Sequence, residues 1–163
     1  VLLVNSFSKT FAMTGWRMGY IASTNLEAMS QIIKMQYYIA ACSNDAMQHA
    51  ILAAMEHASD YPDKLAAEFQ KRCDLIVDRL NAMPGVECHK PKGAIYVFPK
   101  VDVPNMSSEE LALELLKDGV LCSPGSAFGP SGEGHLRFAY TISQEDISRG
   151  MDKVEKTLKR LQS

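Results

Sequence analysis

Apolar residues that recur at helical spacing constrain this chain more than any other feature of its sequence. Near the C-terminus, Ile147, Met151, Val154, Leu158 and Leu161 follow one another at steps of three or four positions. Such spacing places these side chains on one face of an α-helix, where they can pack against a core. Apolar spacing and capping residues predict four more helices, over residues 26–40, about 46–57, about 61–80 and 107–119.

Short stretches rich in β-branched and aromatic residues lie between these helices and are typical of strands. They cover residues 1–4, 16–22, 86–89, 94–98, 120–122 and 135–140. The turn residues 91–93 separate two of these stretches, which we expect to form a hairpin or adjacent strands. Residues 5–15 and 123–134 are rich in small and turn-forming residues, and we expect loops there. The alternation of helices and short strands predicts an α/β or α+β fold, with a boundary near residues 61–62.

Composition and charge exclude several classes of function. The 17 basic and 19 acidic residues give a formal charge of -2, which lacks the positive excess that nucleic-acid binding requires. The cysteines form no Cys-x-x-Cys pair and the histidines form no i, i+4 pair, so we expect no metal site. No apolar run reaches the ~18 residues of a membrane span, so we expect no membrane partner. Unpaired cysteines favour a reducing, cytoplasmic location.

The start of the chain also carries information. It begins with Val1 rather than Met, and residues 1–4 are already typical of a buried strand, with no turn or cap before it. A chain of this length with 47% hydrophobic residues can bury a core in one or two small domains. We therefore expect these residues to be a fragment of a longer protein.

One segment combines an amine, a guanidinium and two hydroxyls. Residues 6–20 read S-F-S-K-T-F-A-M-T-G-W-R-M-G-Y. The amine of Lys9 can attack a carbonyl carbon and form a Schiff base. Arg17 can hold a phosphate with two parallel hydrogen bonds, and the hydroxyls of Ser6 and Ser8 can donate further ones. The combination predicts an anion pocket beside a reactive amine.

This segment resembles the lysine signature of class I and II aminotransferases, in the form found in the aspartate-aminotransferase-like subgroup. The resemblance implies an α/β fold in which residues 1–60 are the C-terminal remnant of a fold-type I large domain. Residues 61–163 would then form the α+β small domain. The implied enzyme is a homodimer that transfers an amino group between an L-amino acid and a 2-oxo acid.

The resemblance also implies roles for the residues of the signature. Lys9 would hold pyridoxal 5′-phosphate (PLP) as a Schiff base and act as the catalytic general base. Ser6, Ser8 and Arg17 would bind the phosphate of the cofactor. The cofactor ring would serve as the electron sink, while the protein orients it.

A second candidate residue is the single arginine in the otherwise apolar stretch at residues 135–140. Burying Arg137 without an anionic partner would be costly, so its side chain must reach solvent or meet an anion. The position resembles the family's arginine that binds the substrate α-carboxylate, which implies that role for Arg137. Residues 91–96 also resemble a family element that lines the substrate side, and residues 124–129 resemble the family's loop that leads to this strand. His135 shares Arg137's side of the predicted strand. We assign no role to these.

The resemblance leaves alternatives open. PLP-dependent β-lyases and synthases of the same fold carry the same signature, and a non-catalytic folded fragment or interaction module could retain it. Family members carry an aspartate and an aromatic residue upstream of this lysine that contact the cofactor ring. We therefore expect that the 163 residues alone do not transaminate. The substrate stays open between aspartate, alanine and aromatic amino acids.

Overall fold

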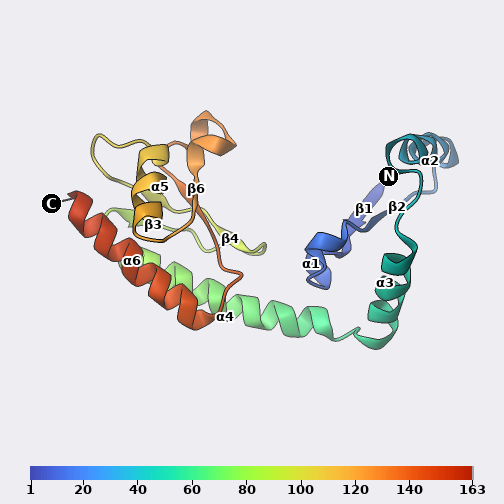
Figure 1. Ribbon diagram of the computed structural model, residues 1–163, viewed down its shortest axis with the longest axis horizontal. Coiled ribbons are helices and arrows are strands. Elements are labelled where there is room, and N and C mark those ends of the chain that lie inside the picture. The colour runs from blue at the N-terminus through green and yellow to red at the C-terminus, as the bar shows by residue number, and fades with distance from the viewer. Residues whose placement is uncertain (163) are drawn as a thin grey trace. The chain divides into compact units, whose positions relative to one another are not determined.

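A computed structural model describes residues 1–162 (Figure 1). The chain divides into two compact units, Val1–Leu65 and a second unit from Ala66 onward. The division falls inside helix α4 (Tyr61–Asn81). The two family domains that the resemblance implies, residues 1–60 and 61–163, stay a prediction, and each compact unit is described below by itself.

The first unit is a two-stranded sheet followed by two helices. Strand β1 (Leu3–Ser6) pairs antiparallel with β2 (Gly19–Ala22), so that Leu3 lies opposite Ala22 and Ser6 lies opposite Gly19. Helix α1 (Phe7–Thr10) and the 3₁₀ turn η1 (Thr14–Trp16) connect the two strands. Helices α2 (Leu26–Ala40) and α3 (Asp45–His57) follow.

Side-chain caps explain where α2 and α3 begin. Asn25 accepts a hydrogen bond from the backbone N–H of Ala28 at 3.0 Å, and Asn44 accepts one from Met47 at 3.1 Å. Each amide oxygen satisfies an N–H group that has no partner inside its helix. The predicted helix at 26–40 is confirmed to the residue, and the one near 46–57 begins one residue earlier.

The predicted loop over residues 5–15 is wrong in part, because residues 7–10 form α1. Ser6 caps this helix by accepting a hydrogen bond from the N–H of Ser8 at 3.2 Å. A helix of one turn has too few residues to show an apolar period, so its sequence did not reveal it.

The first unit buries little apolar surface by itself. Ile51 is the one residue of Val1–Leu65 that is fully buried. Large apolar side chains on its strands and helices stay exposed, including Val4 at 68% and Tyr38 at 77%. Extended apolar surface of this kind is typical of a contact with further protein.

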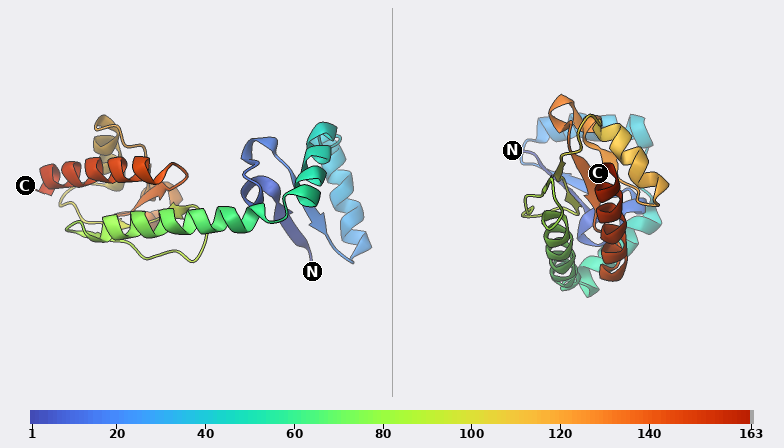
Figure 2. Two further views of the ribbon diagram at one scale, coloured as in Figure 1. Left: turned by 90° about the horizontal axis from the view of Figure 1, so that it is seen from below. Right: turned by 90° about the vertical axis from the view of Figure 1, so that its left-hand side faces the viewer.

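The second unit packs helices against two small sheets (Figure 2). Its helices besides α4 are α5 (Ser108–Lys117) and α6 (Gln144–Gln162), and α6 lies along the part of α4 that belongs to this unit. Arg79 of α4 joins the two helices through ion pairs to Asp152 at 2.5 Å and Glu155 at 3.8 Å.

Five short strands form the sheets of this unit. Strand β7 (Leu136–Ala139) lies between β4 (Tyr96–Val97) and β6 (Ser123–Pro124), and both neighbours run antiparallel to it. Strand β3 (Val86–Glu87) pairs with β5 (Lys100–Val101). The 3₁₀ turns η2 (Gly125–Phe128) and η3 (Pro130–Gly132) connect β6 to β7.

A single core joins these elements. Leu80 of α4 and Leu115 of α5 are fully buried, and Leu136 of β7 is 1% exposed. The apolar stripe predicted for the C-terminal helix is confirmed, because Ile147, Met151, Val154 and Leu158 are buried, and Leu161 packs against the cluster partly exposed.

The predicted pairing of the strands near residues 86–98 is wrong. The two stretches do not pair with each other, since β3 pairs with β5 and β4 pairs with β7. The pairing of β4 with β7 places Val97 opposite Phe138, and both side chains are buried in the core. Burial against a distant strand thus outweighs the local turn at residues 91–93.

The predicted strand at residues 120–122 is also absent, because this segment completes the end of α5. Gly119, at φ 80°, donates its N–H to Leu116, and Val120 donates to Leu115. This pair of bonds is the Schellman motif, which requires a left-handed residue that glycine supplies without strain. The capping box predicted for Ser107 and Glu110 at the other end of α5 is confirmed.

No helix within residues 1–162 is both long enough and apolar enough to cross a membrane.

The packing of α5 gives a direct test of this core. Replacing the fully buried Leu115 by Ala leaves a cavity, and we expect it to lower the free energy of unfolding by about 2–5 kcal/mol. Leu113→Ala on the same helix is the control, because Leu113 is 53% exposed. Urea unfolding followed by circular dichroism measures both, and equal losses would contradict the assigned core.

Candidate functional site

The signature segment folds around the pairing of β1 with β2. Ser6 ends β1, and its hydroxyl donates a hydrogen bond to Ser8 Oγ at 3.0 Å. The N–H of Phe7 donates to the carbonyl of Met18 at 3.2 Å. These bonds bring the two predicted phosphate-binding serines together and hold them against the strand that follows Arg17.

A glycine makes this close pairing possible. A Cβ atom added to Gly19 would lie 2.6 Å from the backbone oxygen of Asn5, which is too close for any side chain. Gly19 lies opposite Ser6 in the register. The second glycine of the signature therefore sets how closely the segment after Arg17 approaches the segment before Lys9.

One residue before η1 and one after it adopt a left-handed backbone conformation, which is unusual for residues other than glycine. Ala12 and Arg17 both have φ 55°. Such conformations cost of order 1–3 kcal/mol each and are concentrated at functional sites. The Arg17 side chain folds back so that Nη1 donates to the carbonyl of Thr14 at 2.9 Å, which leaves its other donors available.

Lys9 lies in α1, which packs against η1. Its side chain is exposed, and its amine has no hydrogen bond or ion pair with any residue from 1 to 162. The predicted nucleophile and the predicted phosphate ligands Ser6, Ser8 and Arg17 therefore belong to one small folded segment.

The arginines differ in whether they form an ion pair with a carboxylate. Four of the six arginines bond to carboxylates: Arg72 to Glu68, Arg79 to Asp152 and Glu155, Arg149 to Asp146, and Arg160 to Glu114 and Asp118. Arg17 and Arg137 form no ion pair with any carboxylate in the described part of the chain. They are the two arginines that the sequence predicted to bind an external anion.

Arg137 lies at the centre of β7 on the face opposite the core. The neighbouring Leu136 and Phe138 are buried, and the alternation of the strand turns Arg137 the other way. Its guanidinium donates to Ser123 Oγ at 3.1 Å, and Ser123 lies directly opposite it on β6. The central carbon of the guanidinium lies 4.6 Å from the ring centre of Tyr96 and 4.7 Å from that of Phe128.

The sequence did not predict Tyr96 and Phe128 as site residues. They fall in the segments 91–96 and 124–129, which resembled family elements but suggested no contacts. A ring beside an arginine depends on pairing between strands that are distant along the chain, so spacing alone gave no signal for it.

A carboxylate anchors the loop that carries Phe128. Glu133 accepts hydrogen bonds from Ser108 at the start of α5, through the backbone N–H at 2.6 Å and the hydroxyl at 3.0 Å. Within the loop, Gly125 and Gly132 approach so closely that a Cβ on Gly125 would lie 1.9 Å from the Gly132 oxygen. The loop therefore has one close-packed arrangement.

His135, Cys88 and Cys122 lie outside the signature segment. His135 stacks on Phe98 with ring centres 5.0 Å apart, and its Nδ1 lies 3.1 Å from the Glu133 carbonyl. Burial raises the pKa of Cys122 to about 11 and that of Cys88 to about 11, so both thiols are protonated at neutral pH. Residues 1–162 contain no cluster of three potential metal ligands.

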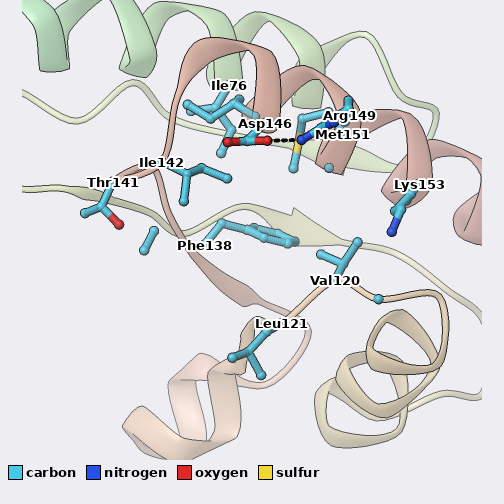
Figure 3. Close-up of a pocket in the computed structure, with 14 residues that line it drawn as sticks. Ile76, Val120, Leu121, Phe138, Thr141, Ile142, Asp146, Arg149, Met151 and Lys153 are labelled. Atoms are coloured by element: carbon cyan, nitrogen blue, oxygen red, sulfur yellow. Dashed lines mark hydrogen bonds and ion pairs between the residues drawn. The ribbon is translucent and has the colours of Figure 1, made fainter.

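A groove of about 600 Å³ lies on the core side of β7 (Figure 3). Its walls are mostly apolar, with Val120, Phe138 and Ile142 among them. Asp146 and Arg149 at its edge bond to each other, as Figure 3 shows. The groove contains none of the predicted site residues and lies on the face of β7 opposite Arg137, so we assign no reaction to it.

Comparison with known proteins identifies the family. The family described as "Aminotransferase class I and II" matches residues 1–154. The chain belongs to the class I and II aminotransferases. The predicted recognition is thereby confirmed, and so is the fold class, since the chain superimposes on solved aminotransferases over nearly its whole length.

Named relatives of this aminotransferase chain are similar over almost all of its residues. It is 38% identical over 161 residues, 97% of its length, to aromatic-amino-acid aminotransferase 2 of Thermococcus litoralis. It is 38% identical over 160 residues, 96% of its length, to the aspartate aminotransferase of Pyrococcus horikoshii. It covers 41% of each of these proteins.

A solved structure gives the same result. The crystal structure of the aromatic aminotransferase from Pyrococcus horikoshii matches 98% of the chain with a TM-score of 0.88 and 36% identity, and the match spans 43% of that protein. The chain therefore spans less than half of the relatives that it matches.

Members of this family use PLP, and the signature segment of this aminotransferase chain fits two parts of that cofactor. The free amine of Lys9 suits an aldehyde carbon, and the unpaired Arg17 with the hydroxyls of Ser6 and Ser8 suits a phosphate.

The anchoring of the loop by Glu133 predicts a pH-dependent effect. The Ser108 N–H, aided by the Gly134 N–H, holds the pKa of Glu133 below its usual value. A carboxyl whose pKa is lower in the folded state adds stability above its unfolded pKa of ~4.3 and loses it as the pH falls through the folded pKa. We expect Glu133→Gln to lower the melting temperature at pH 7. The difference in melting temperature between the variant and the unmodified chain should become smaller below pH ~4.

Glu109→Gln is the control, because Glu109 lies in the first turn of α5, beside the Ser108 that Glu133 binds, and bonds to no other residue of the described chain. Thermal unfolding at several pH values measures both variants. A loss of equal size at pH 7 and pH 3 would contradict the role of the Glu133 charge.

Proposed function

We propose that this chain is part of a PLP-dependent aminotransferase that moves an amino group between an L-amino acid and a 2-oxo acid. The observation that carries the proposal is the pairing pattern of the arginines. Arg17 and Arg137 lack a carboxylate partner among residues 1–162, and both stand at sequence positions that resemble the anion-binding arginines of the family.

Lys9 is the proposed catalytic residue. Its amine has no partner among the described residues, so no ion pair must be broken before it reacts. Nζ of Lys9 would bond the aldehyde carbon of the cofactor at rest. The same Nζ, when it is not bonded to the cofactor, would accept the proton from the substrate Cα as a general base. PLP, when bound, supplies a ring that stabilises the negative charge left on Cα.

The arginines position the two anions of the reaction. Arg17, with the hydroxyls of Ser6 and Ser8, would hold the cofactor phosphate and so fix the ring relative to Lys9. Arg137 would bind the α-carboxylate of the amino acid or 2-oxo acid through two parallel hydrogen bonds. Binding by this planar fork orients the Cα–H bond, which is the bond that must break.

The activity is proposed for a protein of the relatives' length, because this chain covers about 41% of them. We propose that this longer protein is a cytoplasmic homodimer whose partners are small amino and oxo acids, with no role for nucleic acid, membrane or metal. The 163 residues alone are expected to be inactive. Measurable turnover by this chain that depends on Lys9 would contradict that expectation.

Substitution of Lys9 tests the proposed function. In the longer enzyme, we expect Lys9→Ala to remove the near-ultraviolet absorbance of the lysine-bound cofactor and nearly all transamination, because no other amine replaces the nucleophile. Lys34→Ala is the control, since Lys34 is an exposed lysine of α2 and should change neither readout. Absorbance spectra and the rate of 2-oxo acid formation measure both.

Three outcomes separate the alternatives. Retention of absorbance and turnover in Lys9→Ala would contradict the proposal. Formation of pyruvate and ammonia by the unmodified enzyme would indicate a β-lyase. Failure of the unmodified enzyme to bind the cofactor would indicate a non-catalytic protein.

Substitution of Arg137 tests its proposed role in substrate binding. Arg137→Ala removes the carboxylate ligand, and we expect the KM for the amino acid to rise about 100-fold or more, as for the loss of a charge-assisted bidentate bond. Arg137→Lys should recover little, because an ammonium cannot form the planar fork. Steady-state kinetics measure this, and an unchanged KM in Arg137→Ala would remove Arg137 from the substrate site.

A further inference from the structure

Arg137 is enclosed by two aromatic rings rather than by acids. The guanidinium carbon lies within 4.7 Å of both the Tyr96 and the Phe128 ring centres. Cations at this distance from an aromatic ring are attracted by the negative charge of its face. The rings therefore attract the cation without neutralising it, which an acidic neighbour would do.

The rings leave hydrogen-bond donors of the arginine free. A guanidinium has five N–H groups that lie in its plane. Within residues 1–162, Arg137 makes one hydrogen bond, from Nη2 to Ser123 Oγ. The remaining N–H groups are available for an anion that approaches in the plane of the guanidinium.

The backbone fixes the position of each ring. Tyr96 lies on β4 opposite Ala139 of β7. Ala139 follows Arg137 by two positions on the strand, so Tyr96 and Arg137 lie on the same face of the sheet. Phe128 ends η2 in the loop that Glu133 anchors to α5. Phe98 packs against Phe128 edge-on, with ring centres 5.9 Å apart at 89°, so a third ring supports the second.

We propose that Tyr96 and Phe128 are positioning residues that hold Arg137 in the orientation in which it binds a carboxylate. The identity of that carboxylate as the substrate's α-carboxylate rests on the proposed function. The positioning itself is a property of the second unit. Without the rings, the guanidinium rotates among several side-chain conformations, and each carboxylate that binds must first restrict it.

The accessibility of the Arg137 guanidinium beneath the two rings can be measured on the 163-residue chain itself. Phenylglyoxal modifies accessible guanidinium groups, and mass spectrometry of tryptic peptides gives the rate at Arg137. We expect Phe128→Leu and Tyr96→Leu each to raise this rate several-fold, while Tyr96→Phe, which keeps the ring, leaves it unchanged. Arg17 in the same sample is the internal standard, and its rate should not change.

Kinetics of the longer enzyme then test whether the rings position the arginine for substrate. We expect Phe128→Leu and Tyr96→Leu to raise the KM for the amino acid about five- to tenfold, with kcat changed less than about twofold, as for loss of one cation–π contact. Phe128→Tyr should leave the KM at the value of the unmodified enzyme, because it keeps the ring. Phe69→Leu is the matched control, since Phe69 stacks 5.2 Å from Arg72, which stays bonded to Glu68.

The outcomes distinguish this inference from the proposed function. If Arg137→Ala raises the KM but loss of either ring changes neither KM nor modification rate, the positioning role is wrong and the substrate role stands. If Arg137→Ala leaves the KM unchanged, the substrate role fails whatever the rings do. If Phe69→Leu raises the KM as much as Phe128→Leu, the effect comes from general loss of packing and the positioning role is overturned.

Discussion

The alternation of side chains along β7 is the constraint on which the second unit depends. Leu136 and Phe138 enter the core, where they meet Val97 of β4 and the buried faces of the helices. Because successive residues of a strand point to opposite faces, the same burial forces Arg137 out of the core. The strand is therefore both the centre of the packing and the support of Arg137, the proposed carboxylate ligand, and a shift of one residue in register would exchange the two faces.

In the first unit, strand pairing also determines where the candidate side chains lie. The pairing of β1 with β2 determines where Ser6 ends its strand, and Ser6 then caps the short helix that carries Lys9. Gly19 allows the two strands to approach, and the left-handed Arg17 returns the chain to the sheet. The backbone geometry thus places Lys9 and Arg17 in one short segment, and neither is held by an acidic neighbour in the described residues.

Local signals in the sequence predicted the helices well and the strand pairing poorly. Apolar spacing gave α2 and α6, and the capping box at Ser107 gave the start of α5. The hairpin expected near residues 91–93 failed, because β4 pairs with a strand some forty residues away. The candidate site shows the same division. Lys9, Ser6, Ser8, Arg17 and Arg137 came from a contiguous signature or a single exceptional residue, whereas the rings around Arg137 come together only through long-range pairing.

Lys9 is the amine that we propose to hold the cofactor. Borohydride reduction of the PLP-loaded enzyme of the relatives' length, followed by proteolysis and mass spectrometry, would locate the cofactor on one lysine. We expect one reduced cofactor per chain, on the peptide that contains Lys9 and no other. An adduct on a different lysine, or an even distribution over several, would contradict it.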